Sequence, residues 1–188
     1  REAPAVVDGT VYAATRYGTL IALSAAGGTE RWRQTVGEAA TAPAFTSVDG
    51  NPTLVVGTDS GVVAVDADSG EERWDTETAR VRGSPAIAGD LAVVGDEAGV
   101  LRGLALTNGA ERWRVETGGA IHGAPAIGGS HAYVGSRDRW LYAVAVEDGS
   151  VSWRIELPDW VDGSPAIGYG ALFVVDQSGT LSAVHGMQ

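Results

Sequence analysis

A β-propeller of four-stranded antiparallel blades is the all-β fold class that this 188-residue sequence predicts. The first observation is an internal repeat, because "GSPAIAGDLAVVGDEAGVLRGLALTNGAERW" and "GAPAIGGSHAYVGSRDRWLYAVAVEDGSVSW" follow one pattern. The second is the period of about 40 residues, which is typical of propeller blades and also of some helical repeats. The third is the content of 27 glycines, since each would cost about 1 kcal/mol inside a helix and so argues against a helical repeat. The landmarks of the period are Pro4, Pro43, Pro85, Pro125 and Pro165, and Trp32, Trp74, Trp113 and Trp153.

Each unit consists of four short runs with the pattern of β-strands. In the third unit these runs lie at 85–89, 91–96, 100–106 and 111–117, and they are rich in Val, Ile and Leu. The segments between them contain Gly-Asp, Glu-Ala-Gly and Thr-Asn-Gly, where Gly supplies the positive φ of tight turns. The expected repeats are 1–40, 41–82, 83–122, 123–162 and an incomplete 163–188.

The sequence therefore predicts four complete blades plus three strands of a fifth. Both ends look cut, because the chain starts three residues before Pro4 and stops where the last turn of the fifth unit should begin. We expect a segment of a seven- or eight-bladed ring, which needs roughly 280 to 320 residues at this period. The alternative is a closed ring of five blades that lacks one outer strand. An open arc would expose strand edges, so remaining blades or a second chain are expected to close the ring.

Composition excludes several classes of function. The formal net charge is −11, which makes nucleic acid a poor partner, because binding it requires a basic patch. No run of about 18 apolar residues is present, so we expect no direct membrane insertion. The absence of Cys excludes disulfides, thiolate metal sites and thiol catalysis. All 13 basic residues are Arg, which fits either a halophilic protein or GC-rich codon usage.

The segment 64–74, "AVDADSGEERW", resembles the tryptophan-docking repeat of the pyrroloquinoline quinone (PQQ) enzyme-like β-propellers, "A-x-D-x-x-T-G-x-x-x-W", and the resemblance covers essentially the whole chain. In that family the Ala lies on the third strand and the Trp on the outermost strand, where the indole packs between blades. The resemblance implies that Ala22, Ala64, Gly103 and Ala143 hold the Ala position. It also implies that Trp32, Trp74, Trp113 and Trp153 are structural docking residues.

The family contains enzymes and non-enzymes. Its quinoprotein dehydrogenases bind PQQ with Ca²⁺, use an Asp base and often carry an adjacent Cys pair, which this chain lacks. Its non-catalytic members include the lipoprotein subunit of the bacterial barrel-assembly machinery. We expect a non-catalytic binding module with a protein partner, no catalytic residue, no cofactor and no metal. The resemblance favours an extracytoplasmic location. The alternatives are part of a PQQ-dependent dehydrogenase and a sensor domain attached to a kinase or transporter.

A candidate binding face follows from the expected topology. The connections between blades and the turns between the second and third strands gather on one face of a propeller. The position three residues before the repeated Pro differs between units, with Arg82, His122 and Asp162 in the last three. The turn at 137–140 supplies Arg137, Arg139 and Trp140, and Trp160 lies close to Asp162 in sequence. Repeated framework positions beside variable loops indicate a common scaffold that carries individual binding groups.

Each of these residues also has a structural interpretation. His122 has no second His or nucleophile near it in sequence, so it could be an ordinary polar loop residue. The pair Asp96-Glu97 lacks the spacing of a calcium loop and is expected to be a solvated turn. Arg139 and Trp140 replace the Gly-Thr or Gly-Val of other units, and such residues are enriched at interaction hot spots. They could equally pack against an adjacent blade.

Overall fold

The computed structural model describes residues 3–38 and 40–185, and all regular structure in this part of the chain is β-strand. The first two blades contain β1(Ala5–Val7), β2(Thr10–Ala14), β3(Thr19–Ser24), β4(Glu30–Thr35), β5(Ala44–Val48), β6(Asn51–Gly57), β7(Gly61–Asp66) and β8(Glu72–Glu77). The third and fourth contain β9(Ala86–Ala88), β10(Leu91–Gly95), β11(Val100–Ala105), β12(Glu111–Glu116), β13(Ala126–Gly128), β14(His131–Gly135), β15(Trp140–Ala145) and β16(Val151–Glu156). The fifth contains β17(Ala166–Gly168), β18(Ala171–Val175) and β19(Leu181–His185).

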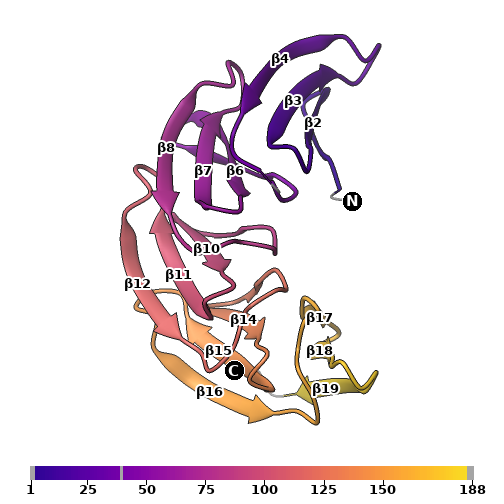
Figure 1. Ribbon diagram of the computed structural model, residues 1–188, viewed down its shortest axis with the longest axis vertical. Helices are drawn as coiled ribbons and strands as arrows, with labels where there is room; N and C mark the ends of the chain where they lie inside the picture. The colour runs from indigo at the N-terminus through magenta and orange to yellow at the C-terminus, as the bar shows by residue number, and fades with distance from the viewer. Residues whose placement is uncertain (1–2, 39, 186–188) are drawn as a thin grey trace.

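Every blade is an antiparallel meander in which neighbours in sequence are neighbours in the sheet. The strand order of the first sheet is β1-β2-β3-β4, three further sheets repeat it, and the fifth has the order β17-β18-β19. The five sheets follow one another along an arc, with β4, β8, β12 and β16 on its convex side (Figure 1). The predicted propeller architecture, with four complete blades and three strands of a fifth, is confirmed in the described residues.

A small residue faces the docking Trp inside each complete blade. The register pairs Ala22 with Trp32 and Gly103 with Trp113, and a bulge follows the small residue in each sheet. A Cβ on Gly103 would lie 2.4 Å from Cε2 of Trp113, so a side chain there would clash with the indole. In the third blade this position therefore requires Gly, whereas the other three complete blades accommodate the Cβ of Ala opposite their Trp.

The indoles of Trp32, Trp74 and Trp113 each reach the next blade. Nε1 of Trp113 donates a hydrogen bond to the carbonyl of Val146 at 2.7 Å, and Trp113 covers Gly149 in the same turn. Trp32 donates in the same way to Ala67 at 2.9 Å, and Trp74 donates to Leu106 at 2.8 Å. The turn that corresponds for Trp153 falls at 186–188, outside the described residues.

The apolar core lies between adjacent blades. One buried cluster joins Leu91, Val93 and Leu101 of the third blade to Ala132 and Val134 of the fourth. The strands carry apolar side chains on both faces because each central sheet is covered by a neighbour on either side. This sandwich of sheets fixes the spacing of the blades, and the connecting loops are left at its two ends.

The antiparallel topology sorts the loops onto two faces. Turns between the first and second strands and between the third and fourth strands share one end of each sheet. Turns between the second and third strands lie at the other end, together with the connections between blades. We call this second surface the rim face, and it carries the candidate residues of the sequence analysis.

Candidate functional site

Backbone hydrogen bonds hold the rim loops in a repeated arrangement. The amide of Glu97 donates to the carbonyl of Arg80 at 2.9 Å, which ties the turn after β10 to the loop before β9. The amide of Gln177 donates to the carbonyl of Trp160 at 2.8 Å at the equivalent place in the fifth blade. The side chains of these loops therefore project from fixed and equivalent positions in successive blades.

Glycines let the loops of neighbouring blades approach one another. A Cβ on Gly83 would lie 2.5 Å from the amide nitrogen of Ala124, and one on Gly123 would lie 2.7 Å from the carbonyl oxygen of Gly163. Each of these glycines directly follows a variable rim residue, namely Arg82, His122 and Asp162. The close packing at the glycines brings these three side chains from successive blades next to one another.

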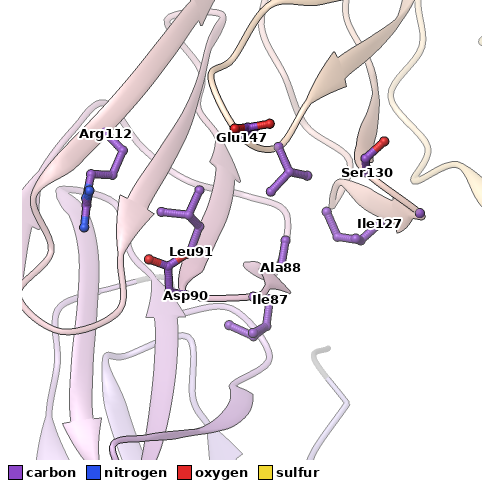
Figure 2. A pocket seen from close by; sticks show the side chains of 11 residues that line it. Ile87, Ala88, Asp90, Leu91, Arg112, Ile127, Ser130 and Glu147 are labelled. Carbon is purple, nitrogen blue, oxygen red and sulfur yellow. The ribbon is translucent and has the colours of Figure 1, made fainter.

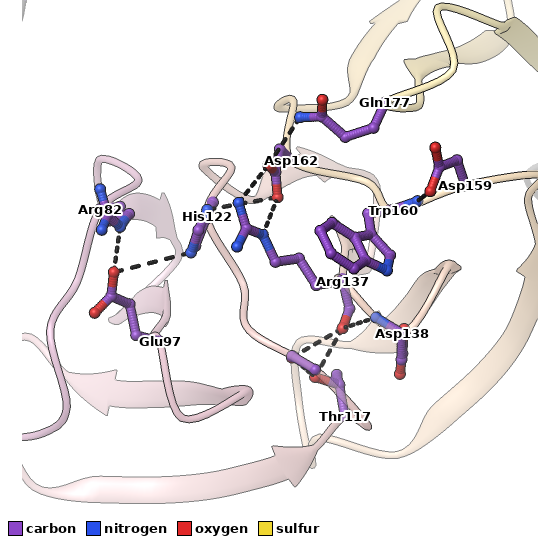
Figure 3. Close-up of polar contacts among 12 residues, drawn as sticks. Arg82, Glu97, Thr117, His122, Arg137, Asp138, Asp159, Trp160, Asp162 and Gln177 are labelled. Atoms are coloured by element: carbon purple, nitrogen blue, oxygen red, sulfur yellow. Dashed lines mark hydrogen bonds and ion pairs between the residues drawn. The ribbon is translucent and has the colours of Figure 1, made fainter.

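Arg82, Glu97 and His122 form the first half of a polar network (Figure 3). Nε of Arg82 donates to Oε1 of Glu97 within the third blade. Nε2 of His122, from the loop before β13, lies 3.9 Å from the same oxygen. Glu97 thus links the third blade to the fourth.

Asp162 is the centre of the second half. It accepts hydrogen bonds from Arg137 through Nε at 2.7 Å and Nη2 at 2.8 Å, and from Nε2 of Gln177 at 2.8 Å. Nδ1 of His122 lies 3.4 Å from Oδ1 of Asp162, so His122 joins the two halves. We call these six residues, Arg82, Glu97, His122, Asp162, Arg137 and Gln177, the rim network; it spans three blades.

The cations of the rim network are more exposed than its carboxylates. The Arg82 side chain is 44% exposed and that of Glu97 is 32% exposed, whereas the values for Arg137 and Asp162 are 38% and 19%. Trp160 is 48% exposed, and the guanidinium of Arg137 lies 5.3 Å from the centre of its ring. The outer layer of this site is therefore guanidinium and indole, with carboxylates beneath.

The network also sets the charge of its members. The hydrogen bond from Arg137 lowers the pKa of Asp162, and the hydrogen bond from Arg82 lowers the pKa of Glu97, so both carboxylates are charged at neutral pH. Burial, followed by the charge of Arg137, lowers the pKa of His122 below its usual value of 6.5. His122 is consequently neutral at pH 7 and can donate from one ring nitrogen only.

The fourth blade ties its rim turn down with further contacts. The amide of Gly118 donates to Oδ2 of Asp138 at 2.7 Å, and the Ser136 hydroxyl donates to Thr117 at 3.2 Å. Tyr142 also donates to Asp138 at 2.6 Å, and burial followed by this hydrogen bond raises the pKa of Tyr142 to about 12. Asp138 is thus a structural acceptor that holds the turn carrying Arg137.

The structure brings together five of the seven residues proposed from sequence, namely Arg82, His122, Arg137, Asp162 and Trp160. The other two residues contact the outer strand β16. Arg139 pairs with Glu156 at 2.7 Å, and Arg154 stacks over the ring of Trp140 at 4.4 Å. Arg139 also has a φ of 77° where three other blades have Gly, so its turn conformation is strained.

The expectation of a solvated turn at Asp96-Glu97 is wrong for Asp96, whose side chain is fully buried, pairs with Arg102 and accepts a hydrogen bond from the amide of Val100. Glu97 and Gln177 were not among the binding residues proposed from sequence. A signal was present, because they follow the second strand of their blades at the position that Arg137 holds in the fourth unit. Comparing equivalent positions across all units, rather than judging each pair alone, would have found them.

A hollow lies on the face opposite the rim face, between the third and fourth blades (Figure 2). It has a volume of about 540 Å³, and its lining includes the apolar side chains of Leu91, Ile127 and Val146. Arg112 and Glu147 stand at its edge. A smaller hollow of about 200 Å³ lies between the second and third blades on the same face. A hollow on this face therefore occurs at more than one junction between blades.

Within the described ranges, no group of three or more His, Asp or Glu side chains is placed to hold a metal ion. The same residues form no helix of the length and apolar character needed to cross a bilayer.

Comparison with protein families gives a match to the model described as outer membrane protein assembly factor BamB, over residues 1–124 and 99–186. Among curated proteins, the serine/threonine-protein kinase AfsK of Streptomyces griseus is 34% identical over 126 residues. That match covers 61% of this chain and 15% of the kinase, so the chain corresponds to a small part of that protein.

Solved propellers match the structure over nearly its whole length. BamB from Moraxella catarrhalis superposes with a TM-score of 0.80 at 25% identity, covering 97% of this chain and 56% of BamB. The computationally designed Ika8 protein superposes with a TM-score of 0.83 at 18% identity, covering 97% of this chain and 57% of Ika8. The chain therefore spans a little over half the length of these two proteins.

Proposed function

The chain belongs to the family of the outer membrane protein assembly factor BamB, and we propose that it is a non-catalytic propeller that binds a protein partner through its rim face. The family description names a role in assembly, which supports a function carried out by contact with other proteins. The binding surface is the rim network together with Trp160.

One observation carries this proposal: the framework repeats from blade to blade, whereas the rim side chains do not. The docking Trp, the small residue opposite it and the glycine beneath it recur. At the equivalent rim positions, Arg82, His122 and Asp162 have different charges. Arg82 is 44% exposed, and His122 and Asp162 are partly buried beside it. The residues that differ from blade to blade therefore lie at the surface of the rim face, where loops on a common scaffold carry individual binding groups.

Photocrosslinking tests which face binds. Trp160 on the rim face and Tyr169 in the turn after β17 on the other face are both exposed aromatic residues, so they form a matched pair for replacement by a photoreactive phenylalanine. We expect illumination of cells to give one discrete protein adduct at position 160 and none at position 169. Adducts only at position 169, or none at either, would overturn the proposal.

Catalysis with PQQ is tested separately. We expect the chain to show no stoichiometric binding of PQQ with Ca²⁺ by calorimetry, and no dye reduction with alcohols or aldose sugars. Stoichiometric binding together with dye reduction would replace the binding module with a quinoprotein dehydrogenase.

A second candidate function is that of a sensor domain in a protein kinase. The similarity to AfsK over 126 residues favours it. Mass spectrometry of the native polypeptide isolated with an antibody against this chain separates the two functions. Kinase-domain peptides on the same polypeptide would support the sensor, and their absence would leave the partner-binding propeller.

A further inference from the structure

We propose that the rim network binds an acidic polypeptide segment, whose carboxylates bond to the outward guanidinium groups of Arg82 and Arg137 and whose apolar side chain rests on Trp160. This inference rests on the proposed function, in which the rim face binds a protein, and it adds the chemistry of the partner.

Unused donors of the two arginines are the first argument. Arg82 bonds to Glu97 through Nε, and no described residue accepts from its two terminal nitrogens. Arg137 uses Nε and Nη2 for Asp162, and no described residue accepts from Nη1. The internal carboxylates therefore hold both guanidinium groups in place while donors remain available for a second carboxylate. A guanidinium that is already ordered loses less side-chain entropy when it binds a partner.

The local charge is the second argument. Arg80 lies in the same loop as Arg82, its positive charge acts on Glu97, and it makes no ion pair with any described residue. Three arginines therefore lie around Glu97 and Asp162, on a chain whose formal net charge is −11. The neighbouring carboxylates of Asp138 and Asp159 accept hydrogen bonds from backbone amides. A partner carboxylate is thus bound by the unused guanidinium donors, and not by an excess of positive charge over the whole site.

Trp160 gives the third argument, because it limits the choice of anion. Its ring is 48% exposed and is held against the guanidinium of Arg137. An exposed indole beside ordered arginines fits a peptide with an apolar side chain between acidic ones. A nucleic acid would need a broader basic surface than these three arginines provide. A polypeptide is therefore the occupant that the surface favours.

A pair of labelled peptides tests the proposal by fluorescence anisotropy. The first has the sequence Glu-Asp-Leu-Glu-Asp, and the second replaces every acid with its amide. We expect the acidic peptide to bind the intact chain at low salt, and the amide peptide to bind at least about tenfold more weakly. Raising the salt to about 0.5 M should weaken the acidic peptide only, because screening acts on exposed charges.

Two protein variants place the binding. Arg82→Gln and Arg137→Gln should each weaken the acidic peptide about tenfold or more, in line with the loss of a charged hydrogen bond. Arg114→Gln is the matched control, since Arg114 is 50% exposed on the outer strand β12 and should leave the affinity unchanged. Gln177 still donates to Asp162 in the Arg137 variant, and circular dichroism of each variant confirms that it is folded.

Three outcomes would overturn the inference: equal binding of both peptides, equal loss in the Arg114 variant, or displacement by inorganic phosphate or duplex DNA at the same charge concentration. Failure here can be distinguished from failure of the proposed function. An adduct at position 160 without acidic-peptide binding would keep the rim as the binding face and reject the acidic partner. The absence of both would reject the two together.

Discussion

Removal of one docking tryptophan measures how strongly adjacent blades hold together. Trp113 is 7% exposed, donates to Val146 and lies over Gly149 of the next blade. Trp113→Ala deletes a buried ring, which costs about 3 to 5 kcal/mol in other proteins. In a protein of this size that corresponds to a fall in Tm of roughly 6 to 20 °C.

The controls divide this cost into its parts. Trp113→Phe keeps an apolar ring but removes the indole N–H, so we expect an intermediate loss that includes about 1 kcal/mol for the hydrogen bond. Gly149→Ala tests the other side of the contact, because its Cβ would lie 2.9 Å from Trp113 and its φ is +75°. Trp160→Ala removes an exposed indole and should change stability by no more than about 0.5 kcal/mol.

Thermal and urea unfolding followed by circular dichroism provide the measurement. A melting temperature for Trp113→Ala within about 1 °C of the original chain would refute the argument that the ring joins the blades. Equal losses in the Trp113→Ala and Trp160→Ala variants would refute it as well, since only Trp113 is buried between blades.

Three further predictions follow from individual contacts. Arg139→Gly should raise stability by up to about 1 kcal/mol, because it relieves a positive φ, and the lost ion pair with Glu156 is half-exposed on both sides; a lower Tm would contradict this. Asp96→Ala should cost about 1 to 3 kcal/mol in urea unfolding, because it removes the side-chain acceptor of the Val100 amide and leaves the largely buried Arg102 with Glu111 as its carboxylate partner; a loss below about 0.5 kcal/mol would show that the buried carboxylate contributes little. The pKa of His122 is lowered in the folded state, so the unfolded state binds more protons just below pH 6.5 and stability falls as the pH falls through that window; His122→Asn should remove this part of the slope, and an unchanged slope would contradict the assignment.

The sequence predicted the framework well because the framework is periodic. A small residue and a tryptophan recur in each of the four complete blades. A turn glycine lies under the indoles of Trp32, Trp74 and Trp113, since each of these indoles needs the same room in the blade beside it. A residue that departs from the repeat pattern in one unit can therefore be recognised by comparison with the other units. The strand bounds differ slightly from expectation, as at β9, where Ala86–Ala88 is shorter than the expected 85–89. Pro85 explains the missing first residue, because it has no amide hydrogen to donate to a strand ladder, and Gly89 is lost at the other end because its φ of 60° places it in the turn.

The position of the rim face could be predicted from the sequence, but the ion pairs among its side chains could not. The repeat places Arg82, His122 and Asp162 at one position in successive blades, without saying which side chains meet. Arg82 takes its carboxylate from its own blade, whereas Arg137 takes Asp162 from the next. The choice depends on the offset between loops and on side-chain length, and neither of these is periodic.

Arg139 and Trp140 could be singled out from the sequence, but the direction of their side chains could not be predicted from it. Their unusual side chains stand out in the sequence, yet β15 begins at Trp140, and the pairing of Trp140 with Glu156 places both residues beside the outer strand. Strand pairing therefore decides their direction, and it directs them to β16.

The rim network couples binding at one blade to the charge state of a residue that contacts two other blades. Each blade of a propeller contacts only its neighbours, so strain introduced in one loop would ordinarily stay local. His122 lies between Glu97 of the third blade and Asp162 of the fifth, and it therefore links two blades that share no sheet contact. An acidic segment that bonds to Nη1 of Arg137 would offset the charge of this guanidinium while its two bonds to Asp162 remain. Burial, followed by the charge of Arg137, lowers the pKa of His122, so offsetting that charge favours protonation of His122. Binding at the rim should consequently take up a proton below neutral pH, and calorimetry in two buffers of different ionisation enthalpy would detect it. A binding heat that is independent of the buffer would show that the bound partner does not change the charge state of His122.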